Sequence, residues 1–530
     1  METLQQYFVR ELHTDDVYIE RLQQEVSILE KLNWIWFLER FIQIYKNHIK
    51  QSLNFLRGSA GSSLVLYYLG INDIDPIKYS IPLTRFVNEL RNTHPDIDMD
   101  VPKSLREQII NDIITNNDDT IRMSNNMSID ALNEEPNENL HKSGIIIYSS
   151  DQKDIIQANK INDNQISLTR DSIGINNLKK IDLLSNVGLQ QLYLIEQNIK
   201  ETNESFSMNS ITFDDENIYK FIVSDDGIGI TYAETPSIQN VIKILKPTNI
   251  EQLSVCLAIV RPFAYDNILI DMTWDTLTNV LIFDDDVIMF LSNKLKISQK
   301  ESDKIRRMLK KDYKHEDLSV IFDNEQMNNL TEEDKNQITK IISNGKKYGF
   351  CKSHSLSYAM LIYKLYYCKC HYPKIFWTNT INSINGYYKD WVYIRKGIKY
   401  DIKFKGFDTC DSFVHFFNTG YWTNKEFISK CYLKMVDEHN NAINNEYLID
   451  NVSNINQKCI FRGIIAGSSE IKTIYSNKQF VITIGYDNDK FIELYTFESK
   501  EYMNYRQIIG GGYYYDYPKP HIKVIKMKTF

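Results

Sequence analysis

The sequence lacks the features of membrane-spanning and secreted proteins. No stretch of about 18 consecutive apolar residues, the minimum for a membrane-spanning helix, occurs in it. The N-terminal segment METLQQYFVRELHTDD is acidic and has no apolar core of a signal peptide. The seven cysteines are scattered, and their odd number leaves one out of any pairing. A reduced, cytoplasmic setting is therefore predicted rather than a disulfide framework or a membrane.

The chain also lacks an excess of basic residues, since its formal net charge is −8. Nucleic-acid-binding domains are more often basic, but charge acts locally. Residues 304–315 and 345–355 are basic, whereas 111–139 are acidic. Internal repeats are absent, and the cysteines and histidine of 368–371 do not have the spacing of a zinc site. The net charge therefore does not exclude a nucleic-acid-binding protein. The local groups of basic and acidic residues are more informative about function than the net charge.

A length of 530 residues allows about three domains. A hydrophobic content of 43% suits a globular protein with sizeable cores. The apolar spacing predicts helices over 15–50, 62–70 and 103–115, strands at 144–148 and 178–184, and a mostly helical region over 205–385. Residues 116–140 are rich in Asn, Asp and Glu and predict a loop. From about residue 457, alternating runs predict a small β-barrel or sandwich.

One strand carries alternating carboxylates. Asp96, Asp98 and Asp100 lie two residues apart, so in a strand they point to the same face. Carboxylates held this close repel one another, and a hard divalent cation relieves the repulsion. The small-residue turn at Gly58 and Ser59 can offer backbone N–H groups to phosphates. Together these features indicate nucleotidyl transfer assisted by two metal ions.

Several segments, in order, resemble the catalytic α subunit of bacterial DNA polymerase III, the C-family replicases. They are RGSAGSSLVLYYLGINDIDPIKYSIPLTRF (57–86), HPDIDMD (94–100), HKSGIIIYS (141–149), LKKIDLL (178–184), VRP (260–262), KIRRMLKK (304–311) and KKYGFCKSHSLSYAMLIYKLYYCKCHYPKIF (346–376). The resemblance implies an α+β multidomain protein. Its parts would be a polymerase-beta-like nucleotidyltransferase palm, helical fingers and a C-terminal OB-like β-barrel.

The resemblance also implies site residues. The catalytic metal ligands would be Asp98, Asp100 and Asp182, holding two Mg²⁺ ions, with Asp96 as a structural acid. The nucleotide- and phosphate-binding residues would be Arg57, Gly58, Ser59, Lys180, Arg306, Arg307, Lys311, Lys352 and His354. Two alternatives stay open, because the arginines could form a solvated helix face and His354 could be a core histidine bonded to a backbone carbonyl.

The implied domains are a palm over 1–205, fingers over 206–385, a mixed connecting region over 386–456 that could be helix-hairpin-helix-like, and the barrel over 457–530. The family's PHP domain has no counterpart, and its thumb would be reduced to about 116–140, which predicts a minimal form with poor processivity. Residues 283–286, Phe-Asp-Asp-Asp, replace a family motif and are interpreted as a helix start. In the barrel, Lys523, Lys526 and Lys528, with Tyr486, Phe491 or Tyr495 for stacking, could bind single strands, or the barrel could only pack.

The predicted function is template-directed DNA synthesis in DNA replication, with dNTPs added to a primer 3′-hydroxyl. The implied partners are primer–template DNA, dNTPs and a sliding clamp or other replisome proteins. The abundance of Asn, Ile, Lys and Tyr suggests an AT-rich phage or mobile element in a bacterial host cytoplasm. Two alternatives remain: a template-independent nucleotidyltransferase on the same palm, and a catalytically inactive nucleic-acid-binding replication protein.

Overall fold

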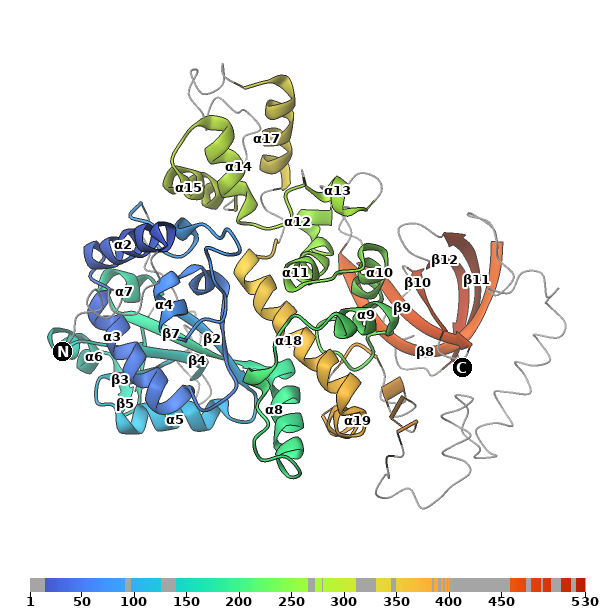
Figure 1. Ribbon diagram of the computed structural model, residues 1–530, viewed down its shortest axis with the longest axis horizontal. Coiled ribbons are helices and arrows are strands. Elements are labelled where there is room, and N and C mark those ends of the chain that lie inside the picture. Colours follow the sequence, from blue (N-terminus) through green and yellow to red (C-terminus); the bar gives the residue numbers. More distant parts are fainter. Residues whose placement is uncertain are drawn as a thin grey trace. The chain divides into compact units, whose positions relative to one another are not determined.

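The computed structural model describes most of the chain (Figure 1). The described residues are 15–90, 97–124, 140–168, 170–265, 272–278, 280–310, 330–344, 349–383, 386–388, 392–393, 396–397, 399–400, 402, 458–472, 478–487, 490–496, 507–515 and 521–529. Asp96, Lys311, most of the 116–140 loop and nearly all of 386–456 lie outside them, as do the barrel side chains singled out above and the side chain of His141.

The chain divides into two compact units. The first comprises Met1–Asp225 and Val241–Tyr366, and the second comprises Asp226–Asn240 and Tyr367–Phe530. These units do not coincide with boundaries near residues 205, 385 and 456, which stay predictions. Among the described residues, the structure has no helix whose length and apolar character would let it cross a membrane.

A seven-stranded sheet organises the first unit. Its strand order is β1 (Phe55–Arg57), β2 (Ile97–Pro102), β7 (Lys179–Asn186), β4 (Leu140–Ile147), β3 (Thr120–Ser124), β6 (Gln165–Ile166) and β5 (Lys160–Asn162). β2 and β7 are parallel, whereas β1 and β4 run antiparallel to their neighbours β2 and β7. Gly144 lies opposite Asp182, so the two strands predicted at 144–148 and 178–184 are present and pair with each other.

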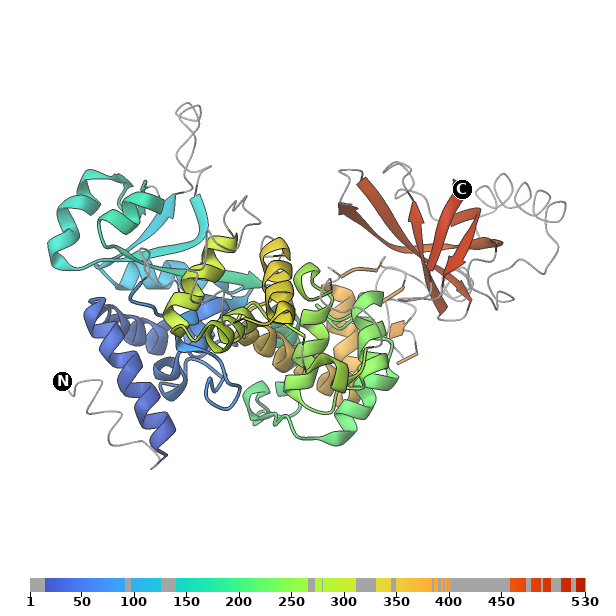
Figure 2. The same cartoon turned by 90° about the horizontal axis from the view of Figure 1, so that it is seen from above.

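Alternation along β2 separates a core face from a polar face. Ile97, Met99 and Val101 are buried in the main hydrophobic cluster together with Ile181 and Leu183 of β7. Side chains of α2 (Asp16–Lys31), α3 (Ile35–Ile44), α4 (Leu64–Tyr68) and α5 (Arg106–Asn116) complete this cluster. The blue helices α2 and α3 lie along one face of the sheet (Figures 1 and 2). The intervening residues of β2 and β7 point to the other face.

The predicted N-terminal helices are confirmed, with the capping that their sequence indicates. Asp15 caps α2 by accepting a hydrogen bond from the Val17 N–H. Ser63 caps α4 by accepting from the Leu66 N–H, and the segment ends at Gly70, whose φ is +66°. A positive φ is what glycine allows after a helix end. The region predicted helical over 15–50 contains α2, α3 and the π-helix η1 (Tyr45–Ile49).

The expected helical region follows β7. Its elements are α8 (Val187–Lys200), η7 (Met208–Ser210), α9 (Glu216–Ser224), α10 (Pro236–Leu245), α11 (Ile250–Ile259), α12 (Pro262–Tyr265), α13 (Trp274–Leu277), α14 (Asp286–Leu295), α15 (Gln299–Lys310), α17 (Glu332–Asn344), α18 (Lys352–His371) and α19 (Pro373–Asn382). The remaining short elements are η2 (Gly58–Ser62), η3 (Leu83–Arg85), η6 (Ser150–Gln152), α6 (Lys153–Ala158) and α7 (Arg170–Ile175). α18 is buried along most of its length, including the polar side chains of Ser353, His354, Ser355 and Ser357.

Five strands of the second unit form a closed barrel. They are β8 (Lys458–Lys472), β9 (Lys478–Asp487), β10 (Lys490–Thr496), β11 (Gln507–Tyr515) and β12 (His521–Thr529), in the order β10-β12-β11-β8-β9. All pairings are antiparallel except that of β10 with β12. The alternating runs after residue 457 therefore form a barrel rather than a sandwich.

Candidate functional site

The polar face of the seven-stranded sheet gathers charged residues from three adjacent strands. Asp98 of β2 lies opposite Asp182 in the parallel pairing with β7. On the other side, Asp98 lies opposite Arg57 of β1. Asp100 follows two residues later in β2 and therefore shares the face of Asp98. The sheet thus brings together residues that lie more than eighty positions apart in the sequence.

The turn that follows β1 comes close to this face. Gly58 has a φ of +67°, and a Cβ added there would lie 3.9 Å from the Asp98 Oδ2. Glycine adopts this left-handed conformation without the strain that other residues incur. The backbone of the predicted phosphate-binding segment therefore turns directly beside a carboxylate, with Ser59 partly buried in η2.

Asp100 is buried and has polar partners for both carboxylate oxygens. Its Oδ1 lies 3.4 Å from the Arg57 Nη1, and its Oδ2 accepts a hydrogen bond of 2.9 Å from the Asn186 Nδ2. Burial raises the pKa of Asp100, while the positive charge of Arg57 acts in the opposite direction. The two partners therefore offset part of the cost of keeping a buried carboxylate ionised.

Asp182 is paired in a similar way. Its Oδ2 lies 2.7 Å from the Lys180 Nζ, and its Oδ1 accepts a hydrogen bond of 3.2 Å from the Ser143 Oγ of β4. Lys180 and Asp182 are two residues apart in β7, so they share one face of the sheet. Lys180, the predicted phosphate ligand, thus forms an ion pair with the predicted metal ligand Asp182.

The donor chemistry of Asp98, Asp100 and Asp182 suits Mg²⁺, which prefers carboxylate oxygens. Within the described part of the chain, no three His, Cys, Asp or Glu side chains come together closely enough to hold a metal ion. In the conformation shown, Arg57 and Lys180 neutralise two of the three carboxylates. For both Asp100 and Asp182 to bind an ion, these two ion pairs would have to loosen.

The segment that follows β1 is fixed by the start of α18. The Ser353 Oγ donates a hydrogen bond of 2.6 Å to the carbonyl of Gly58. The Ser357 Oγ, one turn later, donates to the carbonyl of Leu56 at 3.2 Å. The motif 352–355, Lys-Ser-His-Ser, therefore holds the predicted phosphate-binding segment in place, a role that the sequence alone did not indicate.

This contact leaves no space for a side chain at Gly61. A Cβ there would lie 2.7 Å from the Ser353 Cβ, closer than real carbon atoms approach. Replacement of Gly61 by valine is expected to push α18 away from the segment. Under the DNA synthesis that the family resemblance implies, it would reduce catalytic efficiency by at least about tenfold, because small displacements of positioned groups are costly. Steady-state kinetics of primer extension would measure this effect. Gly174→Val is the control, since an added Cβ there meets nothing within 4 Å; equal rates for both variants would contradict the prediction.

His354 is packed among aromatic rings. Its ring centroid lies 4.5 Å from that of Tyr358 and 5.2 Å from that of Phe350, both at steep angles. Burial, with Arg57 and Arg261 nearby, lowers the pKa of His354 to about 3, so the ring is neutral at physiological pH. Its Nδ1 has no hydrogen-bond partner in the structure. The ring is therefore a core histidine packed by aromatic groups rather than one bonded through Nδ1 to a carbonyl, and its contact with nucleotide stays a prediction.

Arg306 has a different environment from the one that the sequence predicted. Its guanidinium is almost fully buried and pairs with Asp284 at 2.6 Å and Asp303 at 2.7 Å. A solvated helix face does not describe this position, because the guanidinium is buried between two carboxylates. Contact of Arg306 with phosphate stays a prediction. Arg307 is 29% exposed and pairs with Asp303 at 3.1 Å, so it keeps an exposed edge.

The acidic segment 284–286 starts a helix, as predicted. The Asp286 Oδ2 accepts hydrogen bonds from the Ile282 and Phe283 N–H groups at the start of α14. The other two acids do more than the sequence indicated. Asp284 lies 3.7 Å from Arg85, and the Asp285 Oδ2 accepts a hydrogen bond of 2.6 Å from the Lys352 N–H. The segment therefore joins η3, α14, α15 and α18.

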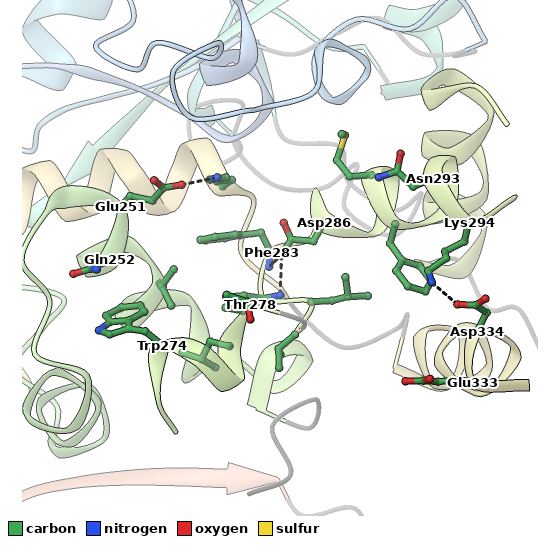
Figure 3. Close-up of a pocket in the computed structure, with 18 of the residues that line it drawn as sticks. Glu251, Gln252, Trp274, Thr278, Phe283, Asp286, Asn293, Lys294, Glu333 and Asp334 are labelled. Carbon is green, nitrogen blue, oxygen red and sulfur yellow. Dashed lines mark hydrogen bonds and ion pairs between the residues drawn. The ribbon is translucent and has the colours of Figure 1, made fainter. Parts of the chain in front are cut away.

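Lys352 lies at the edge of a cavity of about 1050 Å³ in the helical part of the first unit. Its Nζ is held at 2.9 Å by Glu251 of α11. Figure 3 shows Trp274 and Phe283 on the wall of this cavity, and the ion pair of Lys294 with Asp334 at another part of it. The predicted phosphate ligand Lys352 thus lies at a pocket lined by aromatic, aliphatic and acidic side chains, and its binding of phosphate stays a prediction.

Sequence reasoning missed several residues that support either the polar sheet face with its β1 segment or the ion pairs around Asp284 and Arg306. They are Asn186, Ser143, Ser357, Arg85 and Asp303. Asn186 had a usable signal, because an asparagine between a strand and a helix is a favoured helix cap. Asp303 also had a local signal, because Arg306 and Arg307 follow it at helical spacing in α15. Ser143, Ser357 and Arg85 have none, since their partners come from distant parts of the chain.

Comparison with known proteins agrees with this arrangement. Residues 1–123 match the family model described as the bacterial DNA polymerase III alpha NTPase domain, and residues 189–334 match that of the bacterial DNA polymerase III alpha subunit finger domain. The DNA polymerase III subunit alpha of Mycoplasma genitalium is 25% identical over 456 residues, covering 69% of this chain and 52% of that protein. That of Staphylococcus aureus (strain NCTC 8325) is 25% identical over 467 residues, covering 70% and 43%.

The chain therefore spans about half, or less, of the length of the curated relatives it matches. The first family model covers β1 and β2 with Arg57, Asp98 and Asp100, and the second covers the helices around α14 and α15. β7, which carries Lys180 and Asp182, lies between the two matched ranges. The order of the matched parts is also that of the sequence motifs. On this evidence the chain belongs to the bacterial DNA polymerase III α family, the C-family replicases.

Proposed function

We propose that this protein is a template-directed DNA polymerase that adds dNTPs to a primer 3′-hydroxyl in DNA replication. The observation that carries the proposal is the polar sheet face on which Asp98, Asp100 and Asp182 lie on adjacent parallel strands, with Arg57 beside them. Relatives named DNA polymerase III subunit alpha support the same chemistry. Primer–template DNA, dNTPs and replisome proteins are the partners that this function requires.

The residues of the face have separate roles in this proposal. Asp98, Asp100 and Asp182 would hold two Mg²⁺ ions, which when bound activate the attacking hydroxyl and stabilise the leaving pyrophosphate. Arg57 and Lys180 would exchange their carboxylate partners for the phosphates of the nucleotide. Gly58 and Ser59 would offer backbone N–H groups to the same phosphates, since the turn lies beside Asp98. Catalysis would then rest on positioning and charge stabilisation, which dominate phosphoryl transfer.

Primer extension tests the proposal. A primer annealed to templates of different sequence is incubated with all four dNTPs and Mg²⁺, and then with the metal chelated. Products that follow the template and require Mg²⁺ are expected. Extension that ignores the template would instead support a template-independent nucleotidyltransferase, and binding of DNA without extension would support an inactive replication protein.

We also propose that the C-terminal barrel is OB-like and binds single-stranded template weakly. Closed five-stranded barrels of this kind bind oligonucleotides in many proteins, and the final strand β12 (His521–Thr529) is rich in lysine. Replacement of Lys523, Lys526 and Lys528 by serine is expected to weaken binding to an oligothymidine about tenfold at low salt and to reduce the salt slope. Fluorescence anisotropy over a salt series would measure both. An unchanged slope would mean that the barrel has a packing role.

A further inference from the structure

We propose that Asn186 is a positioning residue for Asp100 and that it thereby sets the affinity of the carboxylate face for divalent ions. The inference rests on the proposed function, because it concerns the same carboxylates. It assigns the role to a side chain that neither the sequence motifs nor the family resemblance had singled out. Asn186 is the last residue of β7 and the residue that precedes α8.

Both ends of the Asn186 amide are engaged. The Oδ1 accepts a hydrogen bond of 2.9 Å from the Leu189 N–H and so caps α8. The Nδ2 donates a hydrogen bond of 2.9 Å to the Asp100 Oδ2. A primary amide combines an acceptor and a donor in one rigid plane, which a serine or aspartate at this position does not. The helix cap and the carboxylate are therefore held by one group.

The sheet brings Asn186 to this position. In the parallel pairing of β2 with β7, Asn186 lies opposite Pro102 and Leu184 lies opposite Asp100. Asp182 and Asn186 are four residues apart, so they point to the same face of the sheet. Asn186 is 1% exposed, and the carboxylate that it holds is also buried. Water therefore competes little for this hydrogen bond, and the amide has few other orientations.

The consequence for Asp100 is a fixed orientation of its carboxylate plane. Asn186 holds the Oδ2, and the Oδ1 remains on the side of Arg57 at 3.4 Å. Groups that orient metal ligands through hydrogen bonds commonly change metal affinity or activity by about 10- to 100-fold. Loss of the amide donor would let the carboxylate plane rotate, which would weaken binding of a cation at this position.

Two substitutions separate the positioning role from the capping role. Asn186→Ser keeps a good helix cap but removes the donor to Asp100, whereas Asn186→Ala removes both. Mn²⁺ binding to the full chain, followed by electron paramagnetic resonance, serves as the readout, with thermal melting alongside. The serine variant is expected to bind Mn²⁺ at least about tenfold more weakly at a nearly unchanged melting temperature. The alanine variant is expected to show the same loss together with a lower melting temperature.

The control is Asn249→Ser, because Asn249 caps α11 through the Gln252 N–H at 2.9 Å and lies on a different element from the carboxylates of the sheet. Asn186→Thr, closer in volume to asparagine, replaces the serine variant if that variant loses its fold. Wild-type Mn²⁺ affinity in the folded serine or threonine variant would overturn the proposal, as would the absence of Mn²⁺ binding in the wild-type protein. Weakened Mn²⁺ binding without any primer extension by the wild-type protein would instead uphold the positioning role and refute the polymerase function.

Discussion

Replacing Asp98 or Asp100 by alanine is expected to abolish Mg²⁺-dependent primer extension. Each substitution removes one carboxylate from the face on which the two ions would be held. Besides Asp98 and Asp100, the described residues of β2 include no acid that could replace the lost ligand. A loss of about 4 kcal/mol in transition-state stabilisation corresponds to a rate reduction of roughly a thousandfold. Single-turnover extension with saturating dNTP measures this reduction directly, because it excludes product release.

A matched control uses an acid away from the sheet face. Asp154 is exposed in α6, so Asp154→Ala is expected to leave the extension rate unchanged. Burial raises the pKa of the Asp100 carboxyl group, because a charge is costly in the interior. Asp100→Ala removes this buried carboxyl group, so the variant is expected to keep its fold. Full activity of the Asp98→Ala/Asp100→Ala double variant would refute the assignment of the site, whatever the other variants show.

Replacement of Arg306 by methionine is expected to lower the free energy of unfolding by about 3–5 kcal/mol, because it removes the closest cation from two buried carboxylates. Arg306 is the closest basic partner of Asp284 and also pairs with Asp303, and neither acid is exposed. Urea unfolding followed by circular dichroism measures the loss. A protein weakened this much is expected to unfold at a clearly lower urea concentration.

The neighbouring arginine provides the control. Arg307 shares Asp303 with Arg306 but is partly exposed, so Arg307→Met is expected to cost less than about 1 kcal/mol. If Arg306→Met left stability unchanged and instead raised the KM for dNTP, the residue would contact nucleotide as the family resemblance implies. The two measurements therefore distinguish a structural ion pair from a substrate contact at the same position.

These polar contacts also explain how the helical elements are attached to the sheet-bearing part of the first unit. The Asn88 Nδ2 donates to the carbonyl of Lys300 at 3.0 Å and to the Asp303 Oδ2 at 3.3 Å. Arg85, three residues earlier, lies 3.5 Å from Asp285. Segment 85–88 is therefore joined to α14 and α15 by buried hydrogen bonds and ion pairs rather than by apolar packing alone. Such contacts are directional, so they fix orientation as well as proximity.

The sequence by itself determined the local elements and the two faces of the central strand. The alternation of Ile97, Met99 and Val101 with Asp98 and Asp100 assigns one set to the core and the other to a shared polar face, because side chains alternate along a strand. The caps at Asp15 and Ser63 also follow from local patterns, because both residue types favour helix starts. The pairing of β4 with β7 was instead expected from the family resemblance. The family was recognisable from the order of the motifs.

Only the tertiary structure decided which charges meet. Ser353 and the Gly58 carbonyl are 295 residues apart, and no periodicity connects them. The sequence of the basic run that contains Arg306 does not distinguish a helix that faces solvent from one that contacts phosphate or buried acids. The pairing of Arg306 with Asp284 follows from the packing of α14 against α15. Local patterns encode which side of an element is buried, whereas the partner of a buried polar group is set by elements that meet only in the folded chain. For the same reason the dual hydrogen bonding of Asn186 became visible only when β2 and β7 lay side by side.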